Sequence, residues 1–158
     1  MRFASGMQAI DHVPGYAIEH VFTVYDWASL GDALIVNVGG SRGQAATELA
    51  KEFGSIKLVV QDAERIIQGV ELGVPEELKG RIEFTSHAIF EPQTIKAPVY
   101  LFRMVFRGLG DKYAVLALKA QIPALQPGVK ILIQDVCMPE PGAIPLWRER
   151  VSRYVARC

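Results

Sequence analysis

The chain has 158 residues, 50% of them hydrophobic, and its 17 basic side chains balance 17 acidic ones. A chain of this length suits one globular domain with its own core, and the lack of net charge excludes a broad electrostatic contact with nucleic acid or anionic lipid. We therefore expect a small apolar partner. With only Cys137 and Cys158 and no apolar span of about twenty residues, the sequence predicts neither a disulfide framework nor a membrane helix, which fits a cytoplasmic protein.

Strand and helix patterns alternate along the first half of the chain. The nearly continuous apolar run 33–38 predicts a strand buried on both faces, and two glycines end it. An amphipathic helix is predicted over 42–53, a second strand over 56–62 and a second helix over 63–72. Strands that a helix joins in this way lie parallel in one sheet.

Three more strands are predicted in the second half, at 81–90, 98–106 and 128–138. A helix over 110–125 separates the last two, with Asp111 as its expected N-cap. The predicted fold class is therefore α/β, a Rossmann-like parallel sheet of about five strands with flanking helices. Such sheets bind ligands at the carboxyl ends of their strands. Four residues are expected along this edge: Gly39, Asp62, Ala88 and Arg107.

Apolar residues recur at helical spacing near both ends of the chain, with charged residues between them. They are Phe3, Met7 and Ile10 at the start, and Trp147, Val151, Tyr154, Val155 and Cys158 at the finish. We expect amphipathic terminal helices, which either pack on the chain's own sheet or form a subunit interface. The expected organisation is one domain, with N-terminal helices over 1–30, a Rossmann-like core over 31–140 and a C-terminal helix over 141–158.

The stretch "VNVGGSRG" has the pattern of a loop that binds a nucleotide cofactor. Glycines at 39, 40 and 43 let the backbone approach a ligand, the amides at the start of the following helix face it, and Asp62 at the end of the next strand can accept hydrogen bonds from ribose hydroxyls. The alternative is a tight structural turn followed by a helix-capping aspartate.

Five stretches resemble the class I S-adenosylmethionine-dependent O-methyltransferases, in particular the fungal natural-product type of the caffeate/flavonoid group. They are "YDWASLGDALIVNVGGSRG", "KLVVQD", "LKGRIEFTSHAIF", "VYLFRMVFRGLGDKYAVLALKAQIPALQPG" and "ILIQDVCMPEPGAIPLWRERV". The resemblance implies a methyltransferase fold truncated at both ends, because the family adds a helical dimerisation domain and two further strands. It also implies a homodimer, and an open edge on the fifth strand where the family's seventh strand would pair.

The resemblance carries over a cofactor site with gaps, for S-adenosylmethionine or S-adenosylhomocysteine, and no metal. The residues that match or are compatible are Gly39, Gly40, Gly43, Asp62 and Arg103, the last on the fourth strand where the family has a cation. Asn37 stands where the family has an acid and keeps only an uncharged acceptor. His87 and Ala88 stand where the family has a His-Asp pair, so a carboxylate near the adenine is lost. The resemblance therefore implies weakened or lost cofactor binding.

The reacting centre departs furthest from the family, whose His-Asp-Trp triplet supplies the general base. This chain has Arg107, Gly108 and Leu109 there, and a guanidinium has no acceptor lone pair with which to take a proton. Arg107 can instead donate to a carbonyl or enolate oxygen, assisted by His20 or His87. The alternatives are that Arg107 is a solvent-facing loop residue and that both histidines are solvated or capped.

Three functions follow from these departures. The first is a non-methylating tailoring enzyme of fungal secondary metabolism, which cyclises or rearranges a polyketide-derived substrate, as some pericyclases of this fold do. The second is a genuine O-methyltransferase in which proximity alone moves the methyl group to an acidic phenol. The third is a catalytically inactive binding or scaffolding subunit.

Overall fold

The computed structural model describes residues 17–137, 140, 142–143 and 145–147. Most of the two predicted terminal helices, including 1–16 and 148–158, lies outside the described residues. Within the described part of the chain, no helix has the length and apolar character needed to span a bilayer.

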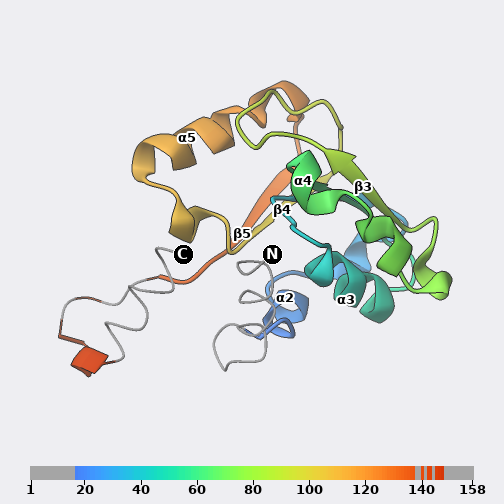
Figure 1. Cartoon of the computed structure of the whole chain (residues 1–158), viewed down its shortest axis with the longest axis horizontal. Coiled ribbons are helices and arrows are strands. Elements are labelled where there is room, and N and C mark those ends of the chain that lie inside the picture. Colours follow the sequence, from blue (N-terminus) through green and yellow to red (C-terminus); the bar gives the residue numbers. More distant parts are fainter. Residues whose placement is uncertain (1–16, 138–139, 141, 144, 148–158) are drawn as a thin grey trace.

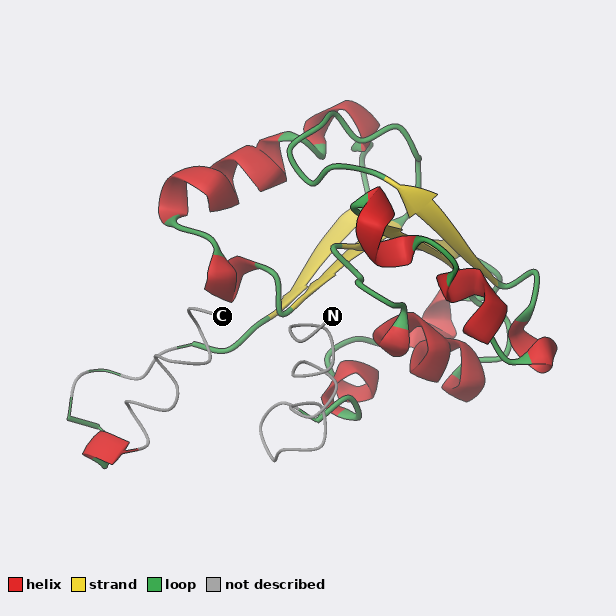
Figure 2. Ribbon diagram, viewed as in Figure 1, coloured by secondary structure: helices red, strands yellow, loops and turns green. Residues whose placement is uncertain are grey.

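Five parallel strands form one sheet in the order β3-β2-β1-β4-β5 (Figures 1 and 2). They are β1 (Leu34–Val38), β2 (Lys57–Asp62), β3 (Ile82–Ser86), β4 (Val99–Arg103) and β5 (Lys130–Gln134). The predicted α/β class, with a five-stranded Rossmann-like parallel sheet, is confirmed. The three inner strands are buried along nearly their whole length, because their apolar residues point to both faces of a sheet that is covered on both sides.

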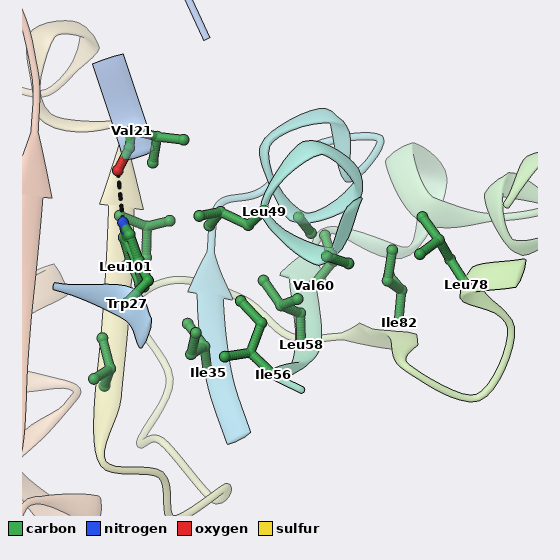
Figure 3. Packing of buried hydrophobic residues seen from close by; sticks show 13 residues of the cluster. Val21, Trp27, Ile35, Leu49, Ile56, Leu58, Val60, Leu78, Ile82 and Leu101 are labelled. Atoms are coloured by element: carbon green, nitrogen blue, oxygen red, sulfur yellow. Dashed lines mark hydrogen bonds between the residues drawn. The ribbon is translucent and has the colours of Figure 1, made fainter. Parts of the chain in front are cut away.

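Helices cover opposite faces of this sheet (Figure 2). On one face, α3 (Gln44–Glu52) packs Ala46, Leu49 and Ala50 against the strands, in the cluster drawn in Figure 3. On the other face lie α5 (Asp111–Lys119) and η5 (Ile122–Ala124), with Ala124 in a second apolar cluster. The alternation of strand side chains assigns each strand residue to one of these two faces.

The second predicted helix, 63–72, is wrong as a continuous element. α4 (Glu64–Ile67) makes one turn and stops, and the 3-10 turns η2 (Val70–Gly73) and η3 (Glu76–Leu78) follow. Gly69 has φ +73°, which lies in the left-handed region and breaks the helix. The helical spacing of apolar residues in the sequence continues past Gly69, because Val70 is a buried apolar residue even though the helix has ended.

Two other predicted details also need correction. Asp111 is the first residue of α5 rather than its N-cap, which is Gly110; the aspartate favours the helix from the first turn instead. The third strand ends at Ser86 and the fourth at Arg103, four and three residues before the predicted ends 90 and 106. In both cases apolar residues continue into the loop that follows.

The segment 17–30 packs against the face of the sheet that α3 covers. It contains α2 (His20–Thr23) and η1 (Trp27–Leu30). The Trp27 side chain is 1% exposed, and its Nε1 donates a 2.7 Å hydrogen bond to the carbonyl oxygen of Val21 (Figure 3). The Lys130 Nζ donates to the Tyr25 hydroxyl at 2.8 Å and lies 5.1 Å from that ring's centroid. This segment is therefore part of the sheet's packing.

β5 forms one edge of the sheet, and in the described part of the chain its outer side pairs with no strand. Ile133, the fourth of the five residues of β5, is 51% exposed. Among the residues that the structure describes, this edge is open, as the resemblance implied.

The burial of Tyr100 makes the stability of the fold depend on pH. Its hydroxyl donates to the carbonyl of Ile95 at 2.6 Å and accepts from the amide of Ala97 at 3.2 Å. Burial raises the pKa of Tyr100 above its ordinary value of 10.0, and the hydrogen bond from Ala97 opposes this. The folded state therefore holds the neutral phenol, and the stability that it contributes is present below pH 10 and lost as the pH rises further.

Tyr100→Phe is expected to lower the free energy of unfolding at neutral pH by about 1–2 kcal/mol, because it removes both hydrogen bonds. Denaturant unfolding at several pH values from neutral to strongly alkaline measures the effect. The wild type should lose more stability than the variant above pH 10. Parallel curves for the two proteins would show that the Tyr100 hydroxyl has no part in the alkaline loss.

Candidate active site

The carboxyl edge of the sheet gathers the residues that the sequence placed there. Gly39 follows β1, Asp62 ends β2, and Ala88 lies two residues beyond β3. Arg107 lies in η4 (Phe106–Gly108), shortly after β4. Because all five strands run parallel, these chain segments leave the sheet at one edge.

Two features require glycine in the loop 39–43: positive φ angles and the lack of room for a Cβ atom. Gly39 and Gly43 have φ values of +68° and +75°. A Cβ on Gly40 would lie 2.3 Å from Asn37 Oδ1 and 2.8 Å from a methyl of Val60, and one on Gly43 would lie 2.8 Å from the Phe84 ring. The loop is therefore built of glycine so that it can pass close to β1, β2 and β3.

Gly40→Ala is expected to weaken S-adenosylhomocysteine binding at least about tenfold and to lower the free energy of unfolding by about 1–3 kcal/mol. The physical reason is that Asn37, 1% exposed, has no room to withdraw from the added methyl. Calorimetric binding and denaturant unfolding measure the two effects. Gly73→Ala is the matched control, since a Cβ there meets nothing within 4 Å. Equal affinities for Gly40→Ala and wild type would contradict this account of the loop.

The Asp62 carboxylate holds the loop to β2. Its Oδ2 accepts a 2.8 Å hydrogen bond from the amide of Ser41, which has φ +52°, and its Oδ1 accepts from the amide of Ala63 at 2.8 Å. The helix-capping role that was the alternative for Asp62 is not what the structure shows, because the N-cap of α4 is Ala63 and no side chain caps that helix. Each Asp62 carboxylate oxygen keeps a further lone pair with which it can accept from a ligand hydroxyl, so holding the loop and binding a ligand are compatible.

Asn37 offers a buried acceptor at the same edge. Its Nδ2 donates to the carbonyl of Leu101 at 3.5 Å, while its Oδ1 has no hydrogen-bond partner among the described residues. A buried unpaired acceptor costs about 1–3 kcal/mol, which a donor group on a ligand would recover. This orphaned oxygen, beside a loop that only glycine can form, fits a polar ligand such as the amino-acid end of an adenosyl cofactor.

Arg103 and Gln134 extend this polar row across the sheet. Asn37 is in register with Val60 and Leu101, and Arg103 with Gln134. Side chains alternate along strands, so Asn37, Asp62, Arg103 and Gln134 all belong to the face that α3 covers. Sequence reasoning missed Gln134; its Oε1 is a second buried acceptor without a hydrogen-bond partner in the described chain.

The turn that carries Arg107 is held by the strand next to it. Asp135, directly after β5, accepts through Oδ2 from the amides of Phe106 at 2.7 Å and Arg107 at 3.0 Å. The amide of Met104, which has φ +58°, donates to the carbonyl of Gln134 at 2.8 Å. Arg107 is partly buried rather than fully solvent-facing. Sequence reasoning missed Asp135, although an acid directly after a buried strand was the pattern that identified Asp62.

The two candidate histidines differ in their placement. His87 follows β3, its amide donates to the carbonyl of Asp62 at 3.0 Å, and its Nε2 is buried without a hydrogen-bond partner in the described chain. His20 is exposed on α2, two residues from Phe22, whose ring contacts Phe53 at the end of α3. Because α3 runs back from the carboxyl ends of the strands, that contact lies near their amino ends. The structure therefore groups His87 with the site and separates His20 from it.

Among the described residues, no three His, Cys, Asp or Glu side chains are grouped so that they could hold a metal ion. The groups gathered at the edge are instead the glycine-loop amides, an Asp carboxylate, two amide acceptors, an imidazole and two guanidinium groups. Such a set suits a polar nucleoside-type ligand and an oxygen that develops negative charge.

Comparison with known proteins finds similarity to methyltransferases. A family model described as an O-methyltransferase domain matches residues 1–156. "O-methyltransferase PaMT" of Phomopsis amygdali is 41% identical over 153 residues, which make up 96% of this chain and 36% of that protein. The chain thus spans about a third of the length of this curated relative.

Solved structures agree with this match. Human N-acetylserotonin methyltransferase in complex with SAM has a TM-score of 0.77 at 22% identity, over 96% of this chain and 43% of that chain, and shows the shared fold. LepI in complex with SAH and a substrate analogue, and a structure described as a pericyclic reaction enzyme, each have a TM-score of 0.68 at 26% identity, over 89% of this chain and 35% of theirs.

The sheet order, the glycine loop and the acid that ends β2 define a protein of the methyltransferase-like α/β class. The chain belongs to the O-methyltransferase domain family.

Proposed function

We propose that this chain is the core of a non-methylating tailoring enzyme of fungal secondary metabolism, which cyclises or rearranges a small apolar substrate derived from a polyketide. The observation that carries the proposal is Arg107, held by Asp135 at the carboxyl edge in the place where the family has its base. A guanidinium there cannot remove a proton from a hydroxyl, but it can stabilise an oxygen that gains negative charge during ring closure. The pericyclic enzyme of the same fold supports this proposal.

His87 is the proposed proton donor or acceptor that would assist Arg107. It follows β3 at the same carboxyl edge, separated from β4 by β2 and β1, and its buried Nε2 has no hydrogen-bond partner among the described residues. His20 stays in the proposal only as a residue that another part of the protein would have to bring closer, since it lies on α2, away from this edge.

An adenosyl ligand remains part of the proposal, as S-adenosylmethionine or S-adenosylhomocysteine. Asp62 would receive the ribose hydroxyls, the loop of Gly39, Gly40 and Gly43 would face the ligand, and Asn37 and Arg103 would bind its amino-acid end. When bound, such a cofactor can supply a methyl group. The complex of LepI with SAH and a substrate analogue supports an adenosyl ligand and a small-molecule substrate on this fold.

A second candidate function is genuine methyl transfer, which the name of PaMT and the retained loop favour. A third is a catalytically inactive binding or scaffolding subunit, which Arg107, a residue without an acceptor lone pair, favours. One experiment separates the three: the purified protein is incubated with a panel of polyketide-derived phenols and polyenes, with and without S-adenosylmethionine, and the products are weighed by mass spectrometry. A gain of one methylene indicates methyl transfer, and an isomer or dehydration product indicates the first proposal. Unchanged substrates would favour the inactive subunit and count against both enzymes.

A homodimer and a cytoplasmic location complete the proposal, with 1–158 acting as one domain in each subunit. The open edge of β5, with Ile133 half exposed, supports an interface there. Sedimentation at micromolar concentration is expected to show a dimer, and Ile133→Lys is expected to weaken it, because a charge would be buried in the contact. Val24→Lys, at a similarly exposed apolar residue directly after α2, is the control. A wild-type monomer would refute the dimer.

A further inference from the structure

Three glutamines from separate parts of the chain form a buried cluster. Gln61, Gln93 and Gln121 are 1%, 3% and 0% exposed. Gln61 belongs to β2, Gln93 to the segment 87–98 between β3 and β4, and Gln121 follows α5. Primary amides are rarely buried together unless their hydrogen bonds are made, because an unpaired buried amide costs free energy.

The hydrogen bonds of this cluster leave each amide only one orientation. Gln93 Nε2 donates to Gln61 Oε1 at 2.7 Å and to Gln121 Oε1 at 3.2 Å, and Gln61 Nε2 donates back to Gln93 Oε1 at 3.1 Å. Gln121 Nε2 donates to the carbonyl of Ala117 at 3.0 Å. Gln93 Oε1 also accepts from two amides of its own segment, those of Thr94 and Ile95. The three side chains are therefore fixed together.

One end of the cluster supports the glycine loop. The carbonyl of Gln61 accepts hydrogen bonds from the amides of both Gly39, at 2.8 Å, and Gly40, at 3.1 Å. The next residue, Asp62, accepts from the amide of Ser41. Three consecutive loop amides thus depend on the last two residues of β2, and the side chain of one of these is locked to Gln93.

The other end reaches the elements on the side of Arg107. The amide of Gln93 donates to the carbonyl of Ala120 at 2.8 Å, directly after α5. α5 begins at Asp111, four residues after Arg107. The cluster therefore connects the strand end that holds the glycine loop with the helix that follows the Arg107 turn.

We infer that Gln61, Gln93 and Gln121 are positioning residues, which hold the glycine loop in its binding geometry and fix it relative to α5. A preformed loop does not have to be ordered when a ligand binds, so affinity is retained even though the site has lost other contacts. The inference rests on the proposed adenosyl site, and it gives these residues a role without contact to the ligand.

The test is Gln93→Met, which keeps the length of the side chain and removes its amide. Hydrogen exchange in the ligand-free protein is expected to be about tenfold faster at Gly39, Gly40 and Ser41, and the affinity for S-adenosylhomocysteine is expected to fall about tenfold. Both are measured at a temperature where the variant is fully folded. Gln121→Met removes fewer bonds and serves if Gln93→Met does not fold; it is expected to give smaller changes in the same direction.

Arg81→Met is the matched control, because Arg81 binds the carbonyls of Phe53 and Ile56 at the opposite edge of the sheet. It is expected to lower stability without faster exchange in the loop or weaker binding. Unchanged loop exchange together with unchanged affinity in the glutamine variants would overturn the inference, as would the same changes in Arg81→Met. If the wild type binds no S-adenosylhomocysteine, the adenosyl site itself is wrong, and the exchange at Gly39 and Gly40 still tests the support of the loop.

Discussion

Arg107→Ala is expected to lower the rate of any cyclisation or rearrangement that this protein catalyses by about a hundredfold or more. Removing one fixed donor from a developing oxyanion typically has an effect of this size, because the donor acts where water is excluded and needs no reorganisation. Asp135 accepts from the backbone amides of Phe106 and Arg107, which alanine retains, so the turn itself is expected to keep its shape. The rate with the reactive member of the substrate panel measures the effect.

Two comparisons make the result specific to Arg107. Arg107→Lys keeps the charge and loses the planar pair of donors, so it is expected to recover part of the rate. Arg65→Ala removes an exposed cation on α4 and should leave the rate unchanged. Full activity in Arg107→Ala, with an unchanged circular dichroism spectrum, would mean that another residue stabilises the reacting oxygen.

S-Adenosylhomocysteine is expected to bind more tightly than S-adenosylmethionine, by about fivefold to a thousandfold. A guanidinium about 4 Å from the sulfonium of the methyl donor would repel it by roughly 1 kcal/mol in water and about 4 kcal/mol at a partly buried site, while the neutral thioether is not repelled. Arg107 is partly buried, so the preference should exceed the lower limit. Calorimetric titration with each ligand measures it.

Charge and salt provide the controls for this preference. Arg107→Gln removes the cation and is expected to bring the two affinities together, whereas the exposed Arg65→Gln is expected to leave the preference as it is. Added salt should reduce the preference only weakly, since partly buried charges are poorly screened. Equal affinities in the wild type, or a reversed order, would show that Arg107 does not face the sulfur of the ligand.

The sheet was predictable because its inner strands are short, largely apolar runs, and because glycine follows β1 and an aspartate ends β2. The runs 33–38 and 56–62 differ by a single residue at the start from β1 and β2. The helix over 63–72 was not predictable in the same way. The helical spacing of its apolar residues continues past Gly69, where the backbone adopts a left-handed conformation. The spacing of apolar residues does not reveal such a change in the φ angle.

The candidate site was predictable where a residue type is rare in a buried strand or loop, as with Asn37, Asp62 and the glycines. Asp135 and Gln93 were missed because their function depends on backbone amides and side chains far away in the chain. Asp135 binds the turn 28 and 29 residues before it, and Gln93 meets Gln61 and Gln121 across separations of 32 and 28 residues. Only the folded chain brings these groups together.

The way in which Asp135 grips the Arg107 turn has an evolutionary consequence. The carboxylate holds main-chain amides, which every residue except proline presents in the same form. These two hydrogen bonds can therefore survive a change of residue at position 107. A substitution there is expected to change the chemistry available at the carboxyl ends of the strands while this anchor of the turn is kept.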